Sequence, residues 1–253
     1  MPDTAVPLIL EARKLSKEFK GFLAVDAVDL GVRRGSIHAL IGPNGAGKTT
    51  MFNLLTRFLS PTRGSIRFND QDITTLRPDV VARRGLVRSF QISAVFPHLT
   101  VLDNVRVALQ NKLGNSYRFW RSEGSLRSLN ARAVDLLEQV DLAGHAGAVA
   151  ADLPYGRKRA LELATTLAMD PELLLLDEPT SGMGHEDVGR VIALIRKVAV
   201  NRTVLMVEHN LRMVADLSDT ITVLQRGSVL AEGSYDELSR DPRVRSAYMG
   251  TKA

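Results

Sequence analysis

The fold is decided by one stretch of sequence, residues 37–49, which reads IHALIGPNGAGKT. Its first five residues form an apolar run of the kind that a buried parallel strand shows. The next eight match the pattern G-x-x-x-x-G-K-[ST], and apolar residues then return at helical spacing, at Met51, Leu54, Leu55 and Phe58. A strand, a glycine-rich loop and a helix in this order make up a P-loop, so the stretch predicts an α/β fold that binds phosphate groups.

The chemistry of this loop follows from its residue types. Glycines let backbone N–H groups turn toward phosphate oxygens, where a side chain would obstruct them. Lys48 supplies a cation for the β- and γ-phosphates, and Thr49 supplies a hydroxyl for Mg²⁺. The alternative, a chance glycine turn, is expected in roughly one chain in a hundred. We therefore predict a nucleotide site formed by Gly42, Pro43, Asn44, Gly45, Ala46, Gly47, Lys48, Thr49 and Thr50.

A second motif places two carboxylates at the end of an apolar run. Residues 173–176 are all leucine, and Asp177 and Glu178 follow directly. A carboxylate at the tip of a buried strand suits the coordination of Mg²⁺, a role that we assign to Asp177. Glu178 is then free to orient and deprotonate an attacking water. Such a strand end is weak support when it stands alone, but after a P-loop it favours nucleotide hydrolysis.

Composition sets limits on the remaining possibilities. The chain has 253 residues, 45% of them apolar, which suits one α/β domain with an inserted subdomain or two small domains. The absence of cysteine excludes disulfides and thiol nucleophiles. The first residues do not resemble a signal peptide, and no apolar stretch approaches the roughly 18 residues that cross a bilayer. We therefore expect a soluble chain, or one that docks onto a membrane through partners.

Positive charge gathers in one segment. The net charge is +5, and residues 112–132 contain five basic residues and a single acidic one, Glu123. A solvated helical face is the simpler interpretation, and contact with a partner or with lipid headgroups is the other. Aromatic residues are sparse there, which argues against a platform for single-stranded nucleic acid, so we expect no nucleic-acid partner.

The remaining elements are predicted from periodicity and turn residues. Residues 91–169 are expected to be mostly helical, as an inserted subdomain. Ser234 and Glu237 have the spacing of a capping box, and Asp241-Pro242 that of a second helix start, so two short terminal helices are expected. The alternation of strands and helices predicts a mostly parallel sheet with its ligand at the carboxyl ends of the strands. Besides residues 37–41, we predict strands at 8–19, 23–32, 65–68, 173–176, 203–207, 220–224 and 229–231.

With both motifs in place, the chain resembles an ABC ATPase over about residues 8–250. The resemblance implies a P-loop NTPase with a RecA-like core, an N-terminal antiparallel β part and an inserted helical subdomain. It divides the chain into a nucleotide-binding core, residues 1–90 and 170–253, and the helical insert, residues 91–169. It also implies ATP and Mg²⁺ as ligands.

The resemblance assigns roles to four more residues. Gln91 stands where the family's Q-loop glutamine contacts Mg²⁺ and senses the membrane partner. His209 matches the switch histidine that touches the γ-phosphate, and Phe19 matches the aromatic residue that stacks on adenine. Gly156 belongs to the signature motif, here LPYGR at 153–157, which contacts the ATP of a second subunit. Three of these residues have a simpler alternative: Phe19 as a core residue, Gln91 as a surface glutamine and His209 as a structural histidine.

Two features depart from the family pattern. The common signature motif is LSGGQ, and here Pro154 replaces the serine and Arg157 the glutamine. The segment 181–184, at the D-loop position, lacks the usual aspartate. Our hypothesis is that hydrolysis survives, but is slower or more dependent on a partner, because a hydroxyl donor is lost.

Four segments resemble one branch of the family in particular. Residues 85–91, 96–105, 153–156 and 241–250 are similar to the ATP-binding subunits of branched-chain amino-acid importers; importers of urea and short-chain amides and the lipopolysaccharide-export ATPase share parts of this pattern. The resemblance implies a dimer, with itself or a paralogue, under two membrane-spanning permease subunits that work with a solute-binding protein. Such a subunit is cytoplasmic and peripheral on the inner face of the cell membrane.

Three other functions compete with this interpretation. A soluble ABC ATPase of DNA repair or translation usually carries two cassettes or a long coiled coil. A small GTPase or kinase shares the P-loop, but no N-K-x-D motif occurs in the chain. A regulatory module that does not hydrolyse ATP is suggested by Pro154 and the altered D-loop, whereas Glu178 and His209 argue against it.

Overall fold

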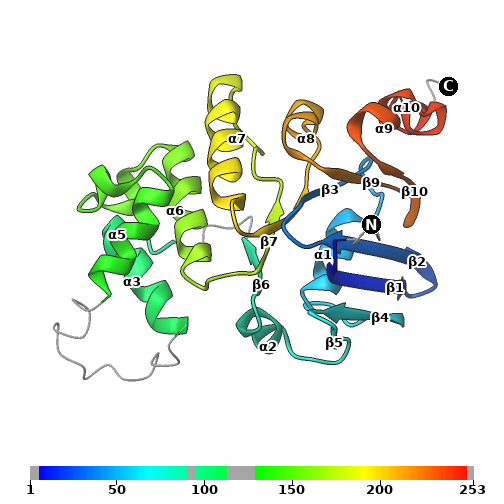
Figure 1. The fold of residues 1–253 in the computed structure, drawn as a ribbon, viewed down its shortest axis with the longest axis horizontal. Helices are drawn as coiled ribbons and strands as arrows, with labels where there is room; N and C mark the ends of the chain where they lie inside the picture. Colours follow the sequence, from blue (N-terminus) through cyan, green and yellow to red (C-terminus); the bar gives the residue numbers. More distant parts are fainter. Residues whose placement is uncertain (1–5, 90–94, 113–128, 250–253) are drawn as a thin grey trace, which may run out of the picture.

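The computed structural model describes residues 6–89, 95–112 and 129–249. Within them, the first of two sheets is antiparallel and has the strand order β2-β1-β4-β5 (Figure 1). Near its middle β1 is bulged at Lys14, which has a φ of 46° and donates its N–H to Asp29. The strands are β1 (Leu8–Phe19), β2 (Phe22–Arg33), β4 (Arg63–Phe68) and β5 (Gln71–Asp72).

The second sheet of the described residues has the order β10-β9-β3-β8-β7-β6. Its neighbours pair in parallel except for the edge strand β10, which runs antiparallel to β9. Every residue of β7 and β8 is buried, as expected for parallel strands that are covered on both faces. The strands are β3 (Ile37–Ile41), β6 (Leu86–Ser89), β7 (Leu173–Asp177), β8 (Thr203–Val207), β9 (Thr220–Gln225) and β10 (Ser228–Gly233).

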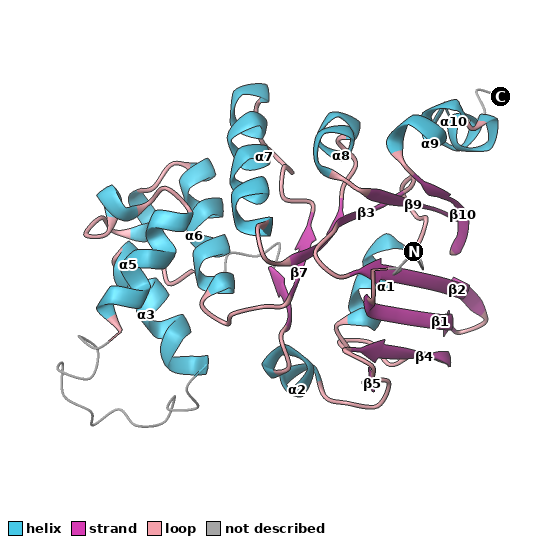
Figure 2. Ribbon diagram, viewed as in Figure 1, coloured by secondary structure: helices cyan, strands magenta, loops and turns pink. Residues whose placement is uncertain are grey.

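Helices cover both faces of this parallel sheet (Figure 2). Short 3-10 turns lie at Ala143–His145 and Ala150–Asp152. The α-helices of the described residues are α1 (Lys48–Leu55), α2 (Pro78–Arg83), α3 (Val101–Lys112), α5 (Asn130–Gln139), α6 (Tyr155–Leu167), α7 (His185–Ala199), α8 (Leu211–Leu217), α9 (Tyr235–Arg240) and α10 (Pro242–Met249).

The two faces of the parallel sheet belong to separate hydrophobic cores. Leu173 and Leu175 of β7 join the core that contains α1 and the antiparallel sheet. Leu174 and Leu176 join the core that contains α3, α5, α6, α7 and α8. This alternation follows from the two-residue period of a strand. It places α1, and the loop that leads into it, between the two sheets.

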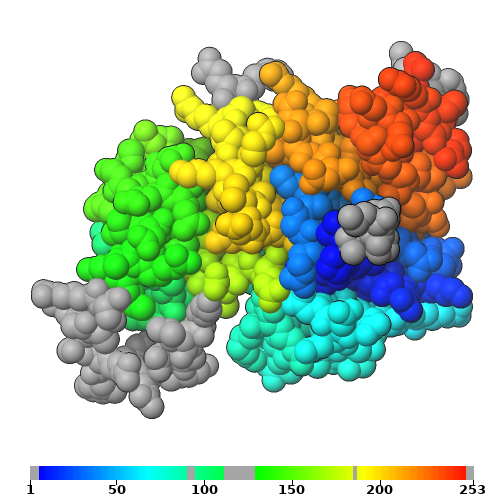
Figure 3. All heavy atoms as spheres, in the orientation of Figure 1, coloured from blue at the N-terminus to red at the C-terminus, as the bar shows by residue number. Residues whose placement is uncertain are grey.

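The antiparallel sheet and the helices α3, α5 and α6 lie on opposite sides of the parallel sheet's central strands. The antiparallel sheet is coloured blue and cyan, and the three helices are coloured green (Figures 1 and 3). In the part of the chain that the structure describes, no helix is long and apolar enough to cross a membrane.

Most predicted elements are confirmed. The strands predicted at 8–19, 37–41 and 203–207 have these bounds, and the α/β fold with its antiparallel part is present. The capping box at Ser234 is formed, because its N–H donates to Glu237 and its hydroxyl accepts from the Glu237 N–H. Strand β6 and helices α2 and α8 were not predicted. The basic stretch 112–132 lies largely outside the described residues.

Candidate nucleotide site

The P-loop runs from the end of β3 to the start of α1 in a space that admits only glycine at two positions. A Cβ atom on Gly42 would lie 2.2 Å from the carbonyl oxygen of Leu224 in β9. A Cβ atom on Gly47 would lie 2.5 Å from the carbonyl oxygen of Ala24 in β2. Gly47 also has a φ of 100°, a backbone conformation that costs glycine little. The two glycines therefore let the loop fit between the antiparallel sheet and β9.

Lys48, the first residue of α1, folds back over this loop. Its Nζ donates to the carbonyl oxygens of Gly42, at 2.7 Å, and Pro43, at 3.1 Å, and the residue is only 9% exposed. Burial lowers the Lys48 pKa, while the charges of Glu178 and Asp177 act in the opposite direction. The cation is thus held at the loop and lies within electrostatic reach of both carboxylates.

The other predicted residues of the loop sit around the start of α1. Thr49, Asn44 and Gly45 are exposed, whereas Ala46 is buried and its carbonyl accepts from the Gly227 N–H at 3.0 Å. The first N–H groups of a helix lack partners inside the helix and favour an anion at its N-terminus. The first turn of α1 contains no acidic side chain that would compete for this position. The exposed rim is suited to a phosphate group.

Asp177 ends β7 beside the P-loop helix and is paired with Arg88 of β6. The guanidinium of Arg88 contacts the buried Asp177 carboxylate and also donates to Asn53 Oδ1 in α1 at 2.6 Å. It lies over the ring of Phe52, 5.7 Å from the ring centroid. This contact was not predicted, because in the sequence Arg88 is only one residue of the segment 85–91. Its signal was a single arginine in a short apolar strand.

Glu178 has an unusual backbone. Its φ is 46°, in the left-handed region that a residue with a side chain rarely adopts. Its N–H donates to the carbonyl of Val207 at 2.9 Å, and its own carbonyl accepts from the Ser181 N–H at 3.0 Å. Such strain is often found at functional sites, held in place by the surrounding structure.

Strand order brings three loops together at one edge of the parallel sheet. Leu40, near the end of β3, pairs with Val207 of β8, and Asp177 of β7 pairs with Val207 from the other side. The P-loop, Glu178 and His209 therefore follow three adjacent strands at their carboxyl ends, where α/β sheets bind ligands. His209 itself is exposed.

Phe19 and Gly156 come from elements other than these three strand ends. Phe19 ends β1 at the hairpin with β2, is 42% exposed, and has the Lys17 ammonium 5.1 Å from its ring centroid. Gly156 is the second residue of α6, and a Cβ atom there would lie 3.6 Å from the Asp187 carboxylate. Gln91 lies outside the described residues, so the structure does not place it.

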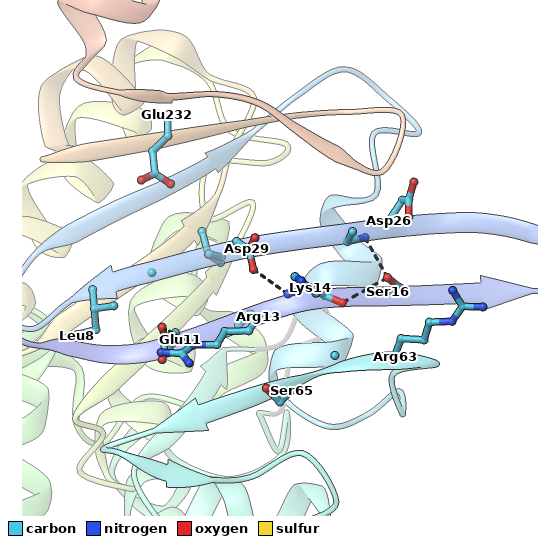
Figure 4. Close-up of a pocket in the computed structure, with 15 residues that line it drawn as sticks. Leu8, Glu11, Arg13, Lys14, Ser16, Asp26, Asp29, Arg63, Ser65 and Glu232 are labelled. Atoms are coloured by element: carbon cyan, nitrogen blue, oxygen red, sulfur yellow. Dashed lines mark hydrogen bonds and ion pairs between the residues drawn. The ribbon is translucent and has the colours of Figure 1, made fainter.

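A cavity of about 900 Å³ opens on the antiparallel sheet, lined by residues of β1, β2 and β4 together with Glu232 (Figure 4). None of the predicted site residues lines it. Its polar groups are partly paired with one another: Glu11 with Arg13 at 2.8 Å, and Asp29 with the Lys14 N–H at 2.7 Å. The convergence of the P-loop, the carboxylates and the histidine therefore locates the candidate site at the parallel sheet.

Two family models match the chain. The model described as ABC transporter matches residues 25–181, and the model described as branched-chain amino acid ATP-binding cassette transporter matches residues 228–253. The first range contains the P-loop, Asp177 and Glu178. The second contains β10 and the two terminal helices.

Named relatives match over nearly the whole chain. The high-affinity branched-chain amino acid transport ATP-binding protein BraF of Pseudomonas aeruginosa is 38% identical, covering 96% of this chain and 98% of its own length. LivG of Escherichia coli, which carries the same description, is 37% identical with the same coverage.

Solved structures of ATP-binding cassettes share the fold. The ADP conformation of the cassette MJ1267 superposes with a TM-score of 0.84 at 27% identity, covering 96% of this chain and 99% of that one. The cassette MJ0796, described as a dimer in a post-hydrolysis state bound to ADP and Pi, has a TM-score of 0.74 at 25% identity and covers 89% and 98%.

Proposed function

The chain belongs to the ABC transporter ATP-binding family, whose members are ATPases coupled to transport, and from this premise we propose that it energises the import of branched-chain amino acids. The observation that carries the proposal is the convergence of the P-loop, Glu178 and His209 at the ends of three adjacent strands. The names of the relatives and the match at residues 228–253 support the choice of solute.

We propose that the P-loop N–H groups and Lys48 hold the phosphates of ATP. Lys48 Nζ exchanges its two carbonyl partners for β- and γ-phosphate oxygens. Thr49, Asp177 and Gln91 would hold Mg²⁺, since hydroxyl, carboxylate and amide oxygens are ligands that this ion prefers. When bound, Mg²⁺ neutralises charge on the β- and γ-phosphates. Asp177 is already held in place by Arg88.

The next two residues act on the γ-phosphate. Glu178 orients a water and takes its proton, which suits a carboxylate fixed by an unusual backbone next to the strand end. His209, from the neighbouring loop, contacts the γ-phosphate oxygens. Phe19 stacks on the adenine ring, and the sheet that carries it approaches the P-loop where Ala24 meets Gly47.

We propose that a second subunit completes each site. Gly156 is the second residue of α6, which lies beside α5 and α3, whereas the P-loop leads into α1 (Figure 1). A head-to-tail pair, with itself or a paralogue, would bring Gly156 and the N-terminus of α6 to the ATP on the other subunit. The dimeric state described for MJ0796 with ADP and Pi supports this arrangement.

The proposed assembly also includes two membrane-spanning permease subunits and a solute-binding protein, with this chain at the inner face of the cell membrane. We propose that residues 91–169 are the helical insert that contacts the permease, and that residues 1–90 and 170–253 are the nucleotide-binding core. The placement of α3, α5 and α6 between β6 and β7 in the chain supports this division.

Transport and association test the proposal together. We expect that deleting the gene abolishes high-affinity uptake of labelled leucine, isoleucine and valine, and that the wild-type gene restores it. Lys48→Ala should not restore uptake, although the variant protein should still co-purify with two integral membrane proteins from solubilised membranes. Unchanged uptake of these amino acids, together with loss of urea or amide uptake, would contradict the choice of solute. Recovery of the chain with ribosomes or DNA and without membrane proteins would contradict the transport function.

A further inference from the structure

A fully buried carboxylate connects the two loops that carry Glu178 and His209. Glu208, with 0% exposure, follows β8 and accepts four hydrogen bonds. Its Oε1 accepts from the N–H of Thr180 at 3.0 Å and from the Thr180 hydroxyl at 2.7 Å. Its Oε2 accepts from the N–H groups of His209 and Asn210, both at 3.0 Å. One side chain thus joins the loop after β7 to the loop after β8.

These hydrogen bonds compensate for the removal of the Glu208 carboxylate from water. A carboxylate removed from water without partners is strongly disfavoured. Among the ion pairs of the described residues none includes Glu208, and backbone N–H groups with one hydroxyl stabilise it instead. Hydrogen bonds to a charged acceptor are stronger than those between neutral groups, so the four bonds hold the Glu208 carboxylate firmly in place.

The loop held by Oε1 is the strained one. Glu178 adopts a φ of 46°, and its N–H bond to Val207 fixes the start of the segment. Two residues later, the bonds from Thr180 to Glu208 fix its end. Without them, the backbone of Glu178 would be free to relax toward commoner angles. On the other side, Asn210 accepts from the Met213 N–H at 3.2 Å and caps α8, so Oε2 joins a well-defined helix start.

We propose that Glu208 is a positioning residue that sets the Glu178 carboxylate and the His209 side chain relative to each other and to the γ-phosphate. It does not contact ATP itself, because it is fully buried behind the two loops. This inference rests on the proposed roles of Glu178 and His209, and it adds a structural cause for their alignment.

The test compares Glu208→Gln with a matched control, using the purified full-length chain. Glutamine has the same shape, but its NH₂ group would replace one of the two carboxylate oxygens and would face the donor groups that this oxygen accepts from. We expect kcat for ATP hydrolysis to fall about tenfold or more while KM for ATP changes less than about twofold, because P-loop binding is untouched. The control is Glu232→Gln, which removes a carboxylate that accepts from the Thr222 hydroxyl at 2.6 Å, outside the nucleotide site. It should leave both constants close to wild type.

A second variant keeps the inference testable if Glu208→Gln does not fold. Thr180→Val removes only the hydroxyl bond to Oε1, and we expect kcat to fall about threefold with KM unchanged. The rate of amide hydrogen exchange should rise in residues 178–184 in both Glu208→Gln and Thr180→Val, even though Glu208 lies in the loop after β8. It should not rise there in Glu232→Gln.

Three results separate the possibilities. An unchanged kcat in Thr180→Val, or equal changes in Glu208→Gln and Glu232→Gln, would overturn the positioning role. Wild-type turnover by Glu178→Gln would instead overturn the proposed role of Glu178 while leaving the measured effect of Glu208 standing. A kcat loss with increased exchange confined to 178–184 and the loop after β8 would support the inference.

Discussion

Several side chains at the site already have partners inside the protein. Lys48 donates hydrogen bonds to loop carbonyls and Asp177 is paired with Arg88, so both charges have partners in the protein itself. A buried charge without a partner is costly, which explains why these internal bonds exist. When ATP binds, its phosphate oxygens must therefore replace the carbonyl oxygens that Lys48 contacts. The exchange favours binding because the phosphates carry a full negative charge, whereas the carbonyls are only dipoles.

Replacement of Lys48 by alanine tests this view at the level of a single residue. The phosphates lose their main cation, so we expect turnover to fall at least about 100-fold, the loss seen when a charge-stabilising donor is removed. Steady-state ATPase assays would measure it. Lys197→Ala is the matched control, since Lys197 pairs with Asp141 on the outside of α7, and it should retain wild-type activity. Activity of Lys48→Ala within threefold of wild type would contradict the assigned role.

Among the elements, β3 connects the nucleotide loop to a polar network in the sheet. His38 on β3 is buried and its Nε2 lies 2.8 Å from the Thr222 hydroxyl of β9. That hydroxyl donates to Glu232 of β10, so it accepts from His38, and Nε2 carries the proton. Burial, assisted by the charge of Arg33, lowers the pKa of His38 to about 4. In the folded protein the buried side chain of His38 is therefore neutral near pH 7.

This lowered pKa predicts a dependence of stability on pH. Between about pH 6.5 and 4, His38 binds a proton in the unfolded chain but not in the folded chain. The contribution of His38 to the free energy of unfolding is therefore complete above pH 6.5 and is lost as the pH falls toward 4. The loss amounts to about 3 kcal/mol. His38→Gln, which keeps a donor for Thr222, should reduce this part of the slope in urea unfolding measured from pH 4.5 to 7.5. An equal slope in both proteins would rule out His38 as its source.

Helix α6, which begins within the signature motif at 153–157, leads to a second prediction at this scale. Pro154 is the N-cap of α6 and provides no side-chain cap. Pro154→Ser adds a hydroxyl that can cap the first turn, worth about 1 kcal/mol, and that can also reach a γ-phosphate on a partner subunit. We expect a higher Tm and faster ATP turnover in the assembled complex. A higher Tm with an unchanged rate would mean that the departure from the family motif has no catalytic effect.

Sequence patterns were informative where the structure depends on local spacing. The apolar run at 37–41, the glycines of the P-loop and the capping box at Ser234 all depend on residues close in the chain. Strand β6 was missed because four residues carry little periodicity. The contacts of Arg88 with Asp177, and of Glu208 with Thr180, join residues far apart in sequence, so they become visible only when the strand order is known.

At the scale of the whole molecule, the P-loop and the segment proposed to contact a second ATP belong to different parts of the fold. The P-loop lies between the sheets, whereas α6, which contains Gly156, lies beside α5 and α3 (Figure 1). We propose that one chain does not bring both to the same ATP. The proposed function therefore requires two subunits for hydrolysis, with ATP bound at the interface between them.

The most direct test of this requirement is the sedimentation of Glu178→Gln with and without saturating Mg-ATP. Loss of the base leaves ATP intact, so the account predicts a monomer without nucleotide and a stable dimer with it. The double variant Lys48→Ala/Glu178→Gln, which lacks the phosphate cation, should remain monomeric under both conditions. A Glu178→Gln protein that binds ATP and yet stays monomeric at saturating Mg-ATP would contradict the proposal that two subunits enclose the nucleotide.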